Sequence, residues 1–457
     1  MMKKQPGGLL QRQIRPERVL ALGFLFLIIL GTILLCLPIS TLTGKPLSVF
    51  DGLFTATSAV CVTGLVAVDT GTTFSLFGQV ILLLLIQVGG LGFMVFATLI
   101  MAMLGRRLSL KDRMLIRESM NSTTLSGLVQ LTEIYGLLAL GIELFGAALF
   151  SIRFVPMYGW AKGLWFGLFH AISAFCNAGF DLFGGFSSLT GFWNDPLVLL
   201  TASLMIILGG IGFSLIFEVI RKRADWPDLT LHTRLVLIAT ATLLAAGTIF
   251  YALIEWDNPA TLAIPDSNVG TKLLGAFFQS VTMRTAGFNS VDLGSMHSAS
   301  KLFSSILMFI GASPASTGGG VKTTTVTVLT LLVWSVVSGQ NDVTIMKKRL
   351  PGDLLRRALS IVVISLLVLL TTTVIVAVAE KDRYPFIDLL FEMSSAVATV
   401  GVSATGTPNL SIVSRALIIP VMYFGRVGPL TLALALANKM NNTSNRVKYP
   451  EEKVMIG

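Results

Sequence analysis

The feature that most constrains the fold of this chain is a fourfold repeat. In each copy a Phe is followed ten residues later by a Gly, at the end of a short, half-apolar stretch. The glycines lie 115, 108 and 114 residues apart. A nearly even period indicates that each unit brings one glycine-containing turn to a common place, where four turns around one axis would form a pore. The pairs are Phe54/Gly64, Phe169/Gly179, Phe277/Gly287 and Phe391/Gly401.

Composition places these units in a membrane. Of the 457 residues, 53% are hydrophobic and only 13% are charged, which is too apolar for a soluble protein of this length. Apolar runs such as 19–38 and 361–378 are long enough to cross a hydrocarbon core of roughly 30 Å as helices. The three cysteines lie in or beside apolar stretches, so we expect neither a disulfide framework nor a transition-metal cluster.

The net charge of +10 is concentrated in a few short segments. Of the 34 Lys and Arg residues, 23 lie in residues 1–18, 105–117, 221–234, 338–357 and after 438. If these segments are cytoplasmic, the positive-inside rule holds throughout, and a multi-pass plasma-membrane protein with cytoplasmic N- and C-termini follows. Each segment adjoins an apolar run, so we do not expect nucleic-acid binding.

We therefore predict an all-α polytopic membrane protein. It would contain four tandem helix–pore-loop–helix units, with eight transmembrane helices and four re-entrant pore helices around a pseudo-fourfold central pore. The predicted boundaries are 1–17 for a cytoplasmic N-terminal segment, 18–117, 118–230, 231–350 and 351–438 for pore units 1 to 4, and 439–457 for a cytoplasmic C-terminal tail. We expect the first helices at 18–39, 125–152, 233–254 and 354–379, and the second helices at 75–104, 196–220, 301–336 and 411–437.

The stretch between the two helices of each unit is too short and too polar for a full span, and its length suits a re-entrant half-helix. Irregular backbone cannot be exposed to lipid, so the turn after each half-helix must be buried in protein or line water. We expect His170 and Glu392 on these half-helices to be structural, with Ser58, Ser173 and Ser395 as hydrogen-bonding neighbours. The predicted half-helices are 51–62, 163–177, 271–285 and 385–399.

The four turns are candidates for a cation filter. Glycine takes positive φ without strain, which lets successive carbonyls turn toward an axis. A ring of carbonyls, aided by the negative C-terminal ends of four half-helices, can replace the hydration shell of a monovalent cation. No acidic residue lies in the turns, so we do not expect a divalent site. The filter residues, with a monovalent cation bound at their carbonyls, would be Val62, Thr63, Gly64, Asn177, Ala178, Gly179, Thr285, Ala286, Gly287, Thr399, Val400 and Gly401.

With the stretches VTGL, NAGF, RTAGFNS and TVGV, the chain resembles the Trk/Ktr/HKT superfamily of potassium transporters over essentially its whole length. It looks most like the shorter Ktr membrane subunits. The resemblance implies potassium uptake across a bacterial cell membrane, with Na⁺ as a possible second or activating ion. It also implies a homodimer, with one pore in each protomer, and a cytoplasmic RCK-type ring of nucleotide-binding regulatory subunits. Candidate docking segments for that ring are 105–117, 221–234 and 338–357.

The second helix of unit 3 is interrupted by a run rich in Gly and hydroxyl residues, which cannot remain a regular helix. We expect an irregular loop at 311–320 beneath the filter, and in the resembled family the corresponding loop is the intramembrane gate. Arg426, deep in an apolar helix, would donate to carbonyls of this loop or form a positive barrier with Lys322. Snorkelling of both cations is the alternative. The gate residues would be Gly311, Ala312, Ser313, Pro314, Ala315, Ser316, Thr317, Gly318, Gly319, Gly320, Lys322 and Arg426.

In units 1 and 2 the same depth carries Gly89-Gly-Leu-Gly and Gly209-Gly-Ile-Gly, which favour close helix packing or a bend. The sequence has no G-x-x-x-x-G-K-[ST] phosphate loop and no nucleophile–base set, so we expect neither an enzyme nor a covalently bound cofactor. A sodium-coupled or alternating-access secondary cation transporter is the alternative function. Its repeats would normally be inverted, whereas all four units here keep one orientation.

Overall fold

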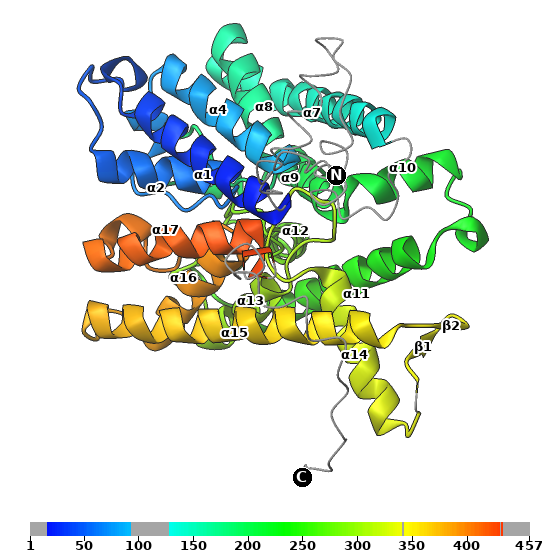
Figure 1. Cartoon of the computed structure of the whole chain (residues 1–457). Coiled ribbons are helices and arrows are strands. Elements are labelled where there is room, and N and C mark those ends of the chain that lie inside the picture. Colours follow the sequence, from blue (N-terminus) through cyan, green and yellow to red (C-terminus); the bar gives the residue numbers. More distant parts are fainter. Residues whose placement is uncertain (1–15, 93–127, 341, 430, 433–457) are drawn as a thin grey trace, which may run out of the picture.

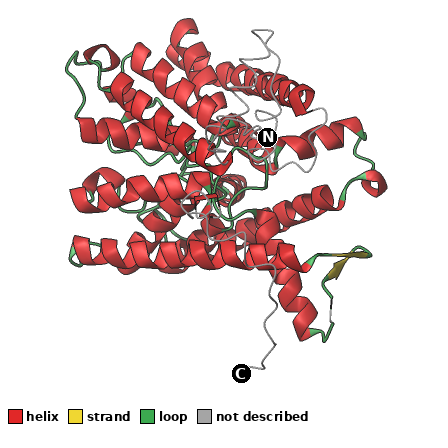
Figure 2. Ribbon diagram, in the orientation of Figure 1, coloured by secondary structure: helices red, strands yellow, loops and turns green. Residues whose placement is uncertain are grey.

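The computed structural model describes residues 16–92, 128–340, 342–429 and 431–432, which are mostly helical (Figures 1 and 2). The segment before residue 16, the basic segment 105–117 and the tail 439–457 lie outside the described residues. The helices are α1 (Pro16–Leu35), α2 (Val49–Val60), α3 (Thr70–Thr73), α4 (Leu76–Leu91), α7 (Leu128–Tyr158), α8 (Trp160–Phe175), α9 (Pro196–Ile211), α10 (Phe213–Arg221), α11 (Leu231–Ile254), α12 (Val269–Thr282), α13 (Ser298–Phe309), α14 (Thr323–Val337), α15 (Gly352–Glu380), α16 (Phe386–Ala398) and α17 (Ile412–Val427). A short antiparallel hairpin, β1 (Thr344–Ile345) and β2 (Lys348–Arg349), precedes α15.

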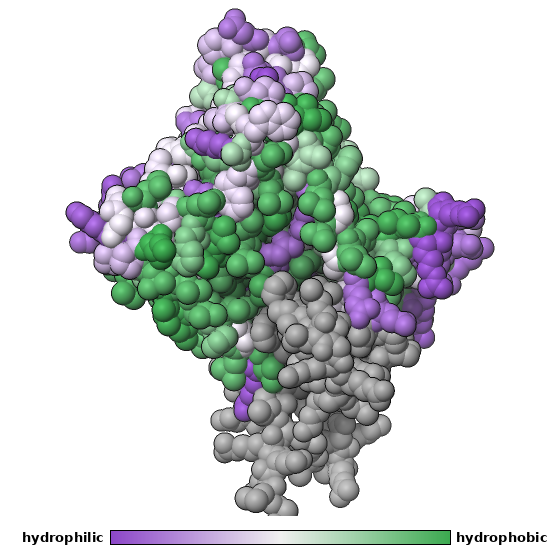
Figure 3. All heavy atoms as spheres, turned by 90° about the horizontal axis from the view of Figure 1, so that it is seen from above, coloured by the Kyte–Doolittle hydropathy of each residue, from purple (hydrophilic) through white to green (hydrophobic). Residues whose placement is uncertain are grey.

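A long apolar helix opens each unit, as predicted: α1, α7, α11 and α15. These four are long and apolar enough to cross a membrane. A fifth span is added if α9 and α10, bent by 95° at a short break, are taken together. Apolar side chains cover the middle of the face in Figure 3, and hydrophilic ones gather toward its left, right and upper ends. The predicted count of eight spans stays a prediction.

The second helices are shorter than predicted, at 16, 16, 12 and 16 residues for α4, α9, α13 and α17. Three of them end at a glycine that occupies the same position in the repeat. Each of these glycines has a positive φ, which glycine adopts without strain and which ends the helix. The predicted spans 196–220 and 411–437 are therefore interrupted, and all of 93–104 lies outside the described residues. The terminating glycines are Gly92 (φ 87°), Gly212 (φ 99°) and Gly428 (φ 91°).

The four predicted half-helices correspond to α2, α8, α12 and α16. The first helix of each unit packs against the half-helix of the same unit. The second helix of each unit packs against the half-helix of the next, as α4 with α8, α9 with α12, α13 with α16 and α17 with α2. Because the last of these contacts joins unit 4 to unit 1, the units follow one another around a closed ring. In Figure 1, α14 leaves the bundle at a steep angle to α15.

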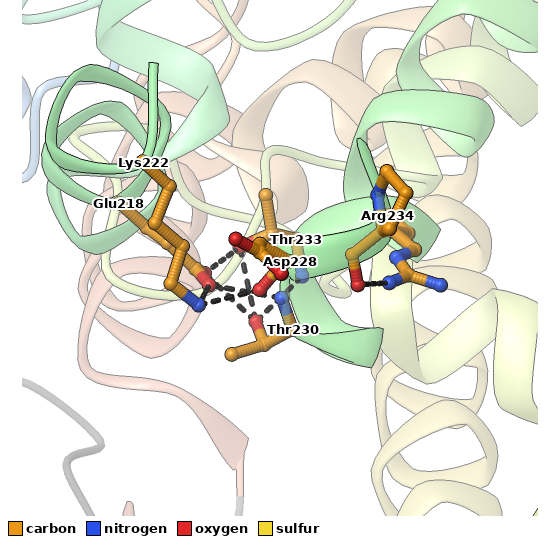
Figure 4. Close-up of polar contacts among 7 residues, drawn as sticks. Glu218, Lys222, Asp228, Thr230, Thr233 and Arg234 are labelled. Atoms are coloured by element: carbon orange, nitrogen blue, oxygen red, sulfur yellow. Dashed lines mark hydrogen bonds and ion pairs between the residues drawn. The ribbon is translucent and has the colours of Figure 1, made fainter. Parts of the chain in front are cut away.

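A carboxylate ties the bent pair α9–α10 to the start of α11. Glu218 accepts hydrogen bonds from the Lys222 ammonium (2.8 Å), from the backbone N–H and hydroxyl of Thr230 (2.9 and 2.8 Å) and from the Thr233 hydroxyl (2.5 Å), as Figure 4 shows. The predicted docking segment 221–234 is therefore a folded connection, and part of its positive charge is bonded internally.

Glycines also let the second helices lie directly against the ends of the half-helices. Gly89, Gly209 and Gly425 stand three residues before the terminating glycines. A methyl group on them would lie 2.2, 1.8 and 2.2 Å from backbone carbonyl oxygens at the ends of α2, α8 and α16. In unit 2 the two interpretations left open by the sequence therefore occur together, close packing at Gly209 and a 95° bend between α9 and α10; in unit 1 only the close packing at Gly89 falls within the described residues.

The packing of α9 can be tested with Gly209→Ala. The added methyl meets the Phe175 carbonyl oxygen, and overpacking of this kind costs roughly 1–3 kcal/mol. We expect the melting temperature of the purified protein in detergent to fall by several degrees. Gly141→Ala on α7 is the control, because its methyl would meet no atom within 4 Å. Equal melting temperatures for the two variants would contradict the proposed tight contact.

Candidate functional site

The four predicted filter turns share one backbone path. Each contains a non-glycine residue in the left-handed region, followed two residues later by a glycine at positive φ. β-Branched residues rarely adopt this conformation, and such strain persists only where the surrounding structure enforces it. The first residues are Val62, Asn177, Thr285 and Thr399, with φ of 54°, 58°, 67° and 52°, and the glycines are Gly64, Gly179, Gly287 and Gly401, with φ of 91°, 68°, 86° and 101°.

Backbone hydrogen bonds close three of these turns as Schellman motifs. After α2, the Val62 N–H donates to the Ala59 carbonyl (3.1 Å) and the Thr63 N–H to the Ser58 carbonyl (2.8 Å). This pattern satisfies the last carbonyls of a helix when the next residue is left-handed. The third turn differs, because the Ala286 N–H donates to the Thr282 carbonyl (3.1 Å). Equivalent pairs close the turns at Asn177–Ala178 and Thr399–Val400.

In each unit a hydroxyl group of the half-helix forms a hydrogen bond with the backbone at or just after the turn glycine. The Gly64 N–H donates to the Ser58 hydroxyl (3.0 Å), and the Gly401 N–H donates to the Ser395 hydroxyl (2.9 Å). In units 2 and 3 a hydroxyl instead donates to the carbonyl just beyond the glycine. These bonds join Ser173 to Phe180 (2.7 Å) and Thr282 to Phe288.

Unlike the groups just described, the backbone carbonyls of the twelve predicted filter residues take part in no hydrogen bond among the described residues. Eleven of these residues are buried and Gly401 is half-buried, yet none of their backbone carbonyl oxygens accepts a hydrogen bond from any described residue. Buried carbonyls are nearly always paired with a donor, an ordered water or an ion. The turns therefore concentrate buried acceptor oxygens that are free to bind water or a cation.

The turns also lie against one another in cyclic order. A methyl group added to any of the four glycines would lie close to the neighbouring turn, so only glycine fits at these positions. The structure thus brings all four predicted segments together. The added methyl would lie 2.4 Å from the Ala178 carbonyl oxygen at Gly64, 2.6 Å from the Gly287 Cα at Gly179, 2.7 Å from the Val400 carbonyl oxygen at Gly287 and 2.0 Å from the Thr63 carbonyl oxygen at Gly401.

The segment 311–320 forms an irregular loop between α13 and α14, where the sequence predicts it. Its two arms pair through the Gly311 N–H and the Val321 carbonyl (2.9 Å), and through the Ala312 N–H and the Gly319 carbonyl (3.2 Å). Methyl groups on Gly318 and Gly319 would lie 2.2 and 2.1 Å from the hydroxyl oxygens of Thr285 and Thr399. The loop therefore lies directly against the third and fourth turns.

The tip of this loop is bound to unit 2. The Ser313 N–H donates to the Gly210 carbonyl (3.0 Å) and the Thr317 N–H to the Gly209 carbonyl (3.1 Å). The Thr317 hydroxyl donates to the carbonyl of Phe175, the last residue of α8 (3.0 Å). The Gly209 and Gly210 carbonyls are free because α9 ends at Gly212, which leaves the last carbonyls of that helix without intrahelical partners, and the Phe175 carbonyl is free because α8 ends there. A methyl on Gly212 would lie 2.6 Å from the Pro314 carbonyl oxygen.

Two cations bind backbone carbonyls around the loop. The Arg426 guanidinium donates to the carbonyls of Thr317 and Gly89 and to that of Gly90 (3.1 Å). The Lys322 ammonium donates to the Gly318 carbonyl (2.7 Å). Gly89 and Gly90 lie in the last turn of α4, where the helix dipole is negative and stabilises a cation. Arg426 thereby joins units 1, 3 and 4.

Sequence reasoning missed the partners of Arg426 on α4, and it also missed a polar chain across units 1 and 2. Both carboxylate oxygens of the buried Glu143 on α7 lie at 2.9 and 3.0 Å from the Gln87 amide nitrogen, which donates to them. The Gln87 amide oxygen accepts from the Cys176 thiol at the start of the second turn (3.5 Å). An isolated Glu in an apolar helix was the available signal. In the described part of the chain, no group of three His, Cys, Asp or Glu side chains could hold a metal ion.

Comparisons with known proteins agree with this arrangement. The family model TrkH, described as a cation transport protein, matches residues 23–447. The Ktr system potassium uptake protein B of Bacillus subtilis is 42% identical over 442 residues, covering 97% of each chain. The potassium/sodium uptake protein NtpJ of Enterococcus hirae is 35% identical over 459 residues, covering 100% of each chain.

Among solved structures, the potassium transporter TrkH from Vibrio parahaemolyticus matches with a TM-score of 0.71. It is 16% identical, and the match covers 94% of this chain and 87% of that one, so this likeness concerns the fold alone. Because the family model spans nearly the whole chain and two relatives share more than a third of its residues over their full lengths, the chain belongs to the TrkH family of cation transport proteins.

Proposed function

We propose that this protein takes up K⁺ through a filter made of the four glycine turns. The observation that carries the proposal is the ring of buried turn carbonyls without hydrogen-bond donors. Such oxygens can replace the hydration shell of a monovalent cation, and the C-terminal ends of four half-helices add a favourable negative potential. The names of the B. subtilis and E. hirae relatives support potassium as the substrate, and the E. hirae name supports sodium as a further ion.

The proposed setting is a bacterial plasma membrane, with four pore-loop units, eight spans and cytoplasmic termini. The four long apolar helices and the closed order of contacts support this arrangement. A sodium-coupled, alternating-access mechanism is less favoured, because the four units keep one orientation and inverted repeats are the usual architecture for that mechanism.

The loop 311–320 would act as the gate on the inner side of the filter. Its contacts with two turns would obstruct the ion path, and its bonds to Arg426, Gly209 and Gly210 would hold it there. Because several of these bonds are between backbone groups of different units, a small shift of one unit would release the loop. Lys322, bonded to the loop itself, would move with it.

The protein would work as a homodimer beneath which an RCK-type nucleotide-binding ring controls the gate. Several relatives are named as Ktr system potassium uptake proteins B and D, and membership of a named system supports a further component. Among the described residues, the segments 221–234 and 338–357, which includes the β1–β2 hairpin, would meet the ring.

Gly64→Ser tests the filter. A side chain at this positive φ would meet the Ala178 carbonyl oxygen, a clash of roughly 1–3 kcal/mol that would displace the ring of oxygens. We expect the K⁺/Na⁺ flux ratio in proteoliposomes to fall at least about fivefold. The control is Gly44→Ser, which also replaces a glycine at positive φ but has open space around it. Unchanged selectivity in Gly64→Ser would refute the filter.

Arg426→Ala tests the gate. Hydrogen bonds to a charged group contribute about 1.5–3 kcal/mol, so losing them should favour release of the loop. We expect K⁺ flux in liposomes without any partner to rise about tenfold, and a deletion within 313–319 to act in the same direction. Arg356→Ala, which removes an exposed cation from α15, should leave flux unaltered. If Arg426→Ala and the deletion both behave like Arg356→Ala, the loop is not the gate.

A further inference from the structure

Two opposite half-helices carry a strongly polar residue at the same place in the repeat. Counting nine residues back from each turn glycine gives Thr55, His170, Phe278 and Glu392 in units 1 to 4. All four are buried. The units follow one another around a closed ring, so units 2 and 4, which carry His170 and Glu392, face each other across it.

His170 holds the segment that leaves the second turn. Its Nδ1 lies 2.7 Å from the Phe166 carbonyl oxygen, and its Nε2 lies 3.4 Å from the Leu182 backbone nitrogen. A carbonyl can only accept and a backbone N–H can only donate, so the ring must be neutral with its proton on Nδ1. The imidazole thus joins α8 to the backbone three residues beyond Gly179.

Glu392 likewise holds the segment that leaves the fourth turn, and it does so through more hydrogen bonds than His170. Its carboxylate accepts hydrogen bonds from the hydroxyls of Ser403 (2.7 Å), Thr405 (3.1 Å) and Thr407 (2.6 Å), and from the backbone N–H of Ala404. Ala404 stands three residues beyond Gly401, as Leu182 stands beyond Gly179. The described part of the chain places no Lys or Arg in a salt bridge with Glu392, so the four donors are what stabilise this buried carboxylate.

The hydrogen bonds of Glu392 attach the chain on the outgoing side of the fourth turn. The fourth turn is held on its incoming side by Ser395, which accepts from the Gly401 N–H, and on its outgoing side by Glu392. Hydrogen bonds on both sides of the turn oppose rotation of its carbonyls away from the ring. Since a hydrogen bond to a charged acceptor is about twice as strong as a neutral one, the carboxylate is the firmest of these attachments.

We propose that Glu392 is a positioning residue for ion selectivity. It fixes the segment 402–407 and thereby the carbonyls of the fourth turn, while His170 does the same for the opposite turn. The inference rests on the filter function proposed above, and it assigns the rigidity of the filter to side chains that do not touch the ion.

The test is the K⁺/Na⁺ flux ratio of Glu392→Gln in proteoliposomes. Glutamine keeps the size of the side chain, but its amide NH₂ faces donors and cannot accept their hydrogen bonds. We expect the ratio to fall about tenfold, equivalent to roughly 1.4 kcal/mol of discrimination, because K⁺ flux falls while Na⁺ flux persists. Glu392→Asp should recover part of the ratio, because the carboxylate remains.

Glu255→Gln is the matched control. Glu255 is also buried and accepts from Asn258 (2.7 Å), Thr261 (2.9 Å) and the His297 backbone N–H (2.9 Å), but these bonds hold the loops around α11 and α13. A general loss of folding should affect both variants, whereas a fall in the K⁺/Na⁺ flux ratio should occur only in Glu392→Gln. If Glu392→Gln lowers K⁺ and Na⁺ flux by the same factor, the proposal is overturned.

Thr407→Val provides a milder variant if Glu392→Gln does not fold. It removes one hydroxyl from the carboxylate, and a smaller fall in the ratio is expected, with no further fall when it is combined with Glu392→Gln. Gly64→Ser, measured in parallel, separates the two hypotheses. If it lowers the ratio and both Glu392→Gln and Thr407→Val do not, only the positioning role fails. If none of the three does, the filter itself fails.

Discussion

Unpaired backbone groups inside a membrane are the constraint on which the rest of this structure depends. The hydrocarbon core supplies no water, so each carbonyl and N–H that leaves a helix must find a partner in the protein. The loop 311–320 shows the consequence. Its N–H groups bind the carbonyls that are freed where α9 ends, and its Thr317 carbonyl accepts from Arg426. The break between α13 and α14 is therefore stabilised by the carbonyls left free at the end of α9.

The same constraint gives the intramembrane arginine its place. A guanidinium has five N–H donors and no acceptor, so it suits a site where several carbonyls converge. Arg426 corresponds in the repeat to Gly90, Gly210 and Ala312, which are small residues in the other three units. Of these four positions only Arg426 carries a long side chain, and its hydrogen bonds join three units.

Close approach is the second requirement, and glycine meets it. The turn glycines accept a positive φ and leave no Cβ between neighbouring turns, while the glycines of α4, α9 and α17 let these helices lie against the half-helix ends. These contacts surround the turns closely, so residues such as Val62 and Thr399 keep left-handed conformations that they would rarely adopt alone.

Much of this arrangement could be predicted from the sequence. The positions of the half-helices, the glycine turns and the irregular loop in unit 3 followed from the repeat and from helix-breaking residues, because these are local properties. The ends of α4 and α9 were placed too late. The apolar composition continues beyond Gly92 and Gly212, and hydropathy does not reveal that a glycine adopts the positive φ that ends a helix.

The sequence by itself thus determined the membrane class of the protein, the positions of the half-helices and the residues that form the turns, because apolar composition, repeat period and glycine position are local properties of the chain. Only the tertiary structure decided which units touch. It paired Arg426 with α4, attached Glu143 to Gln87 and directed Glu392 to the segment beyond Gly401. Such bonds join residues far apart in the chain, and their geometry depends on how the helices pack around the ring.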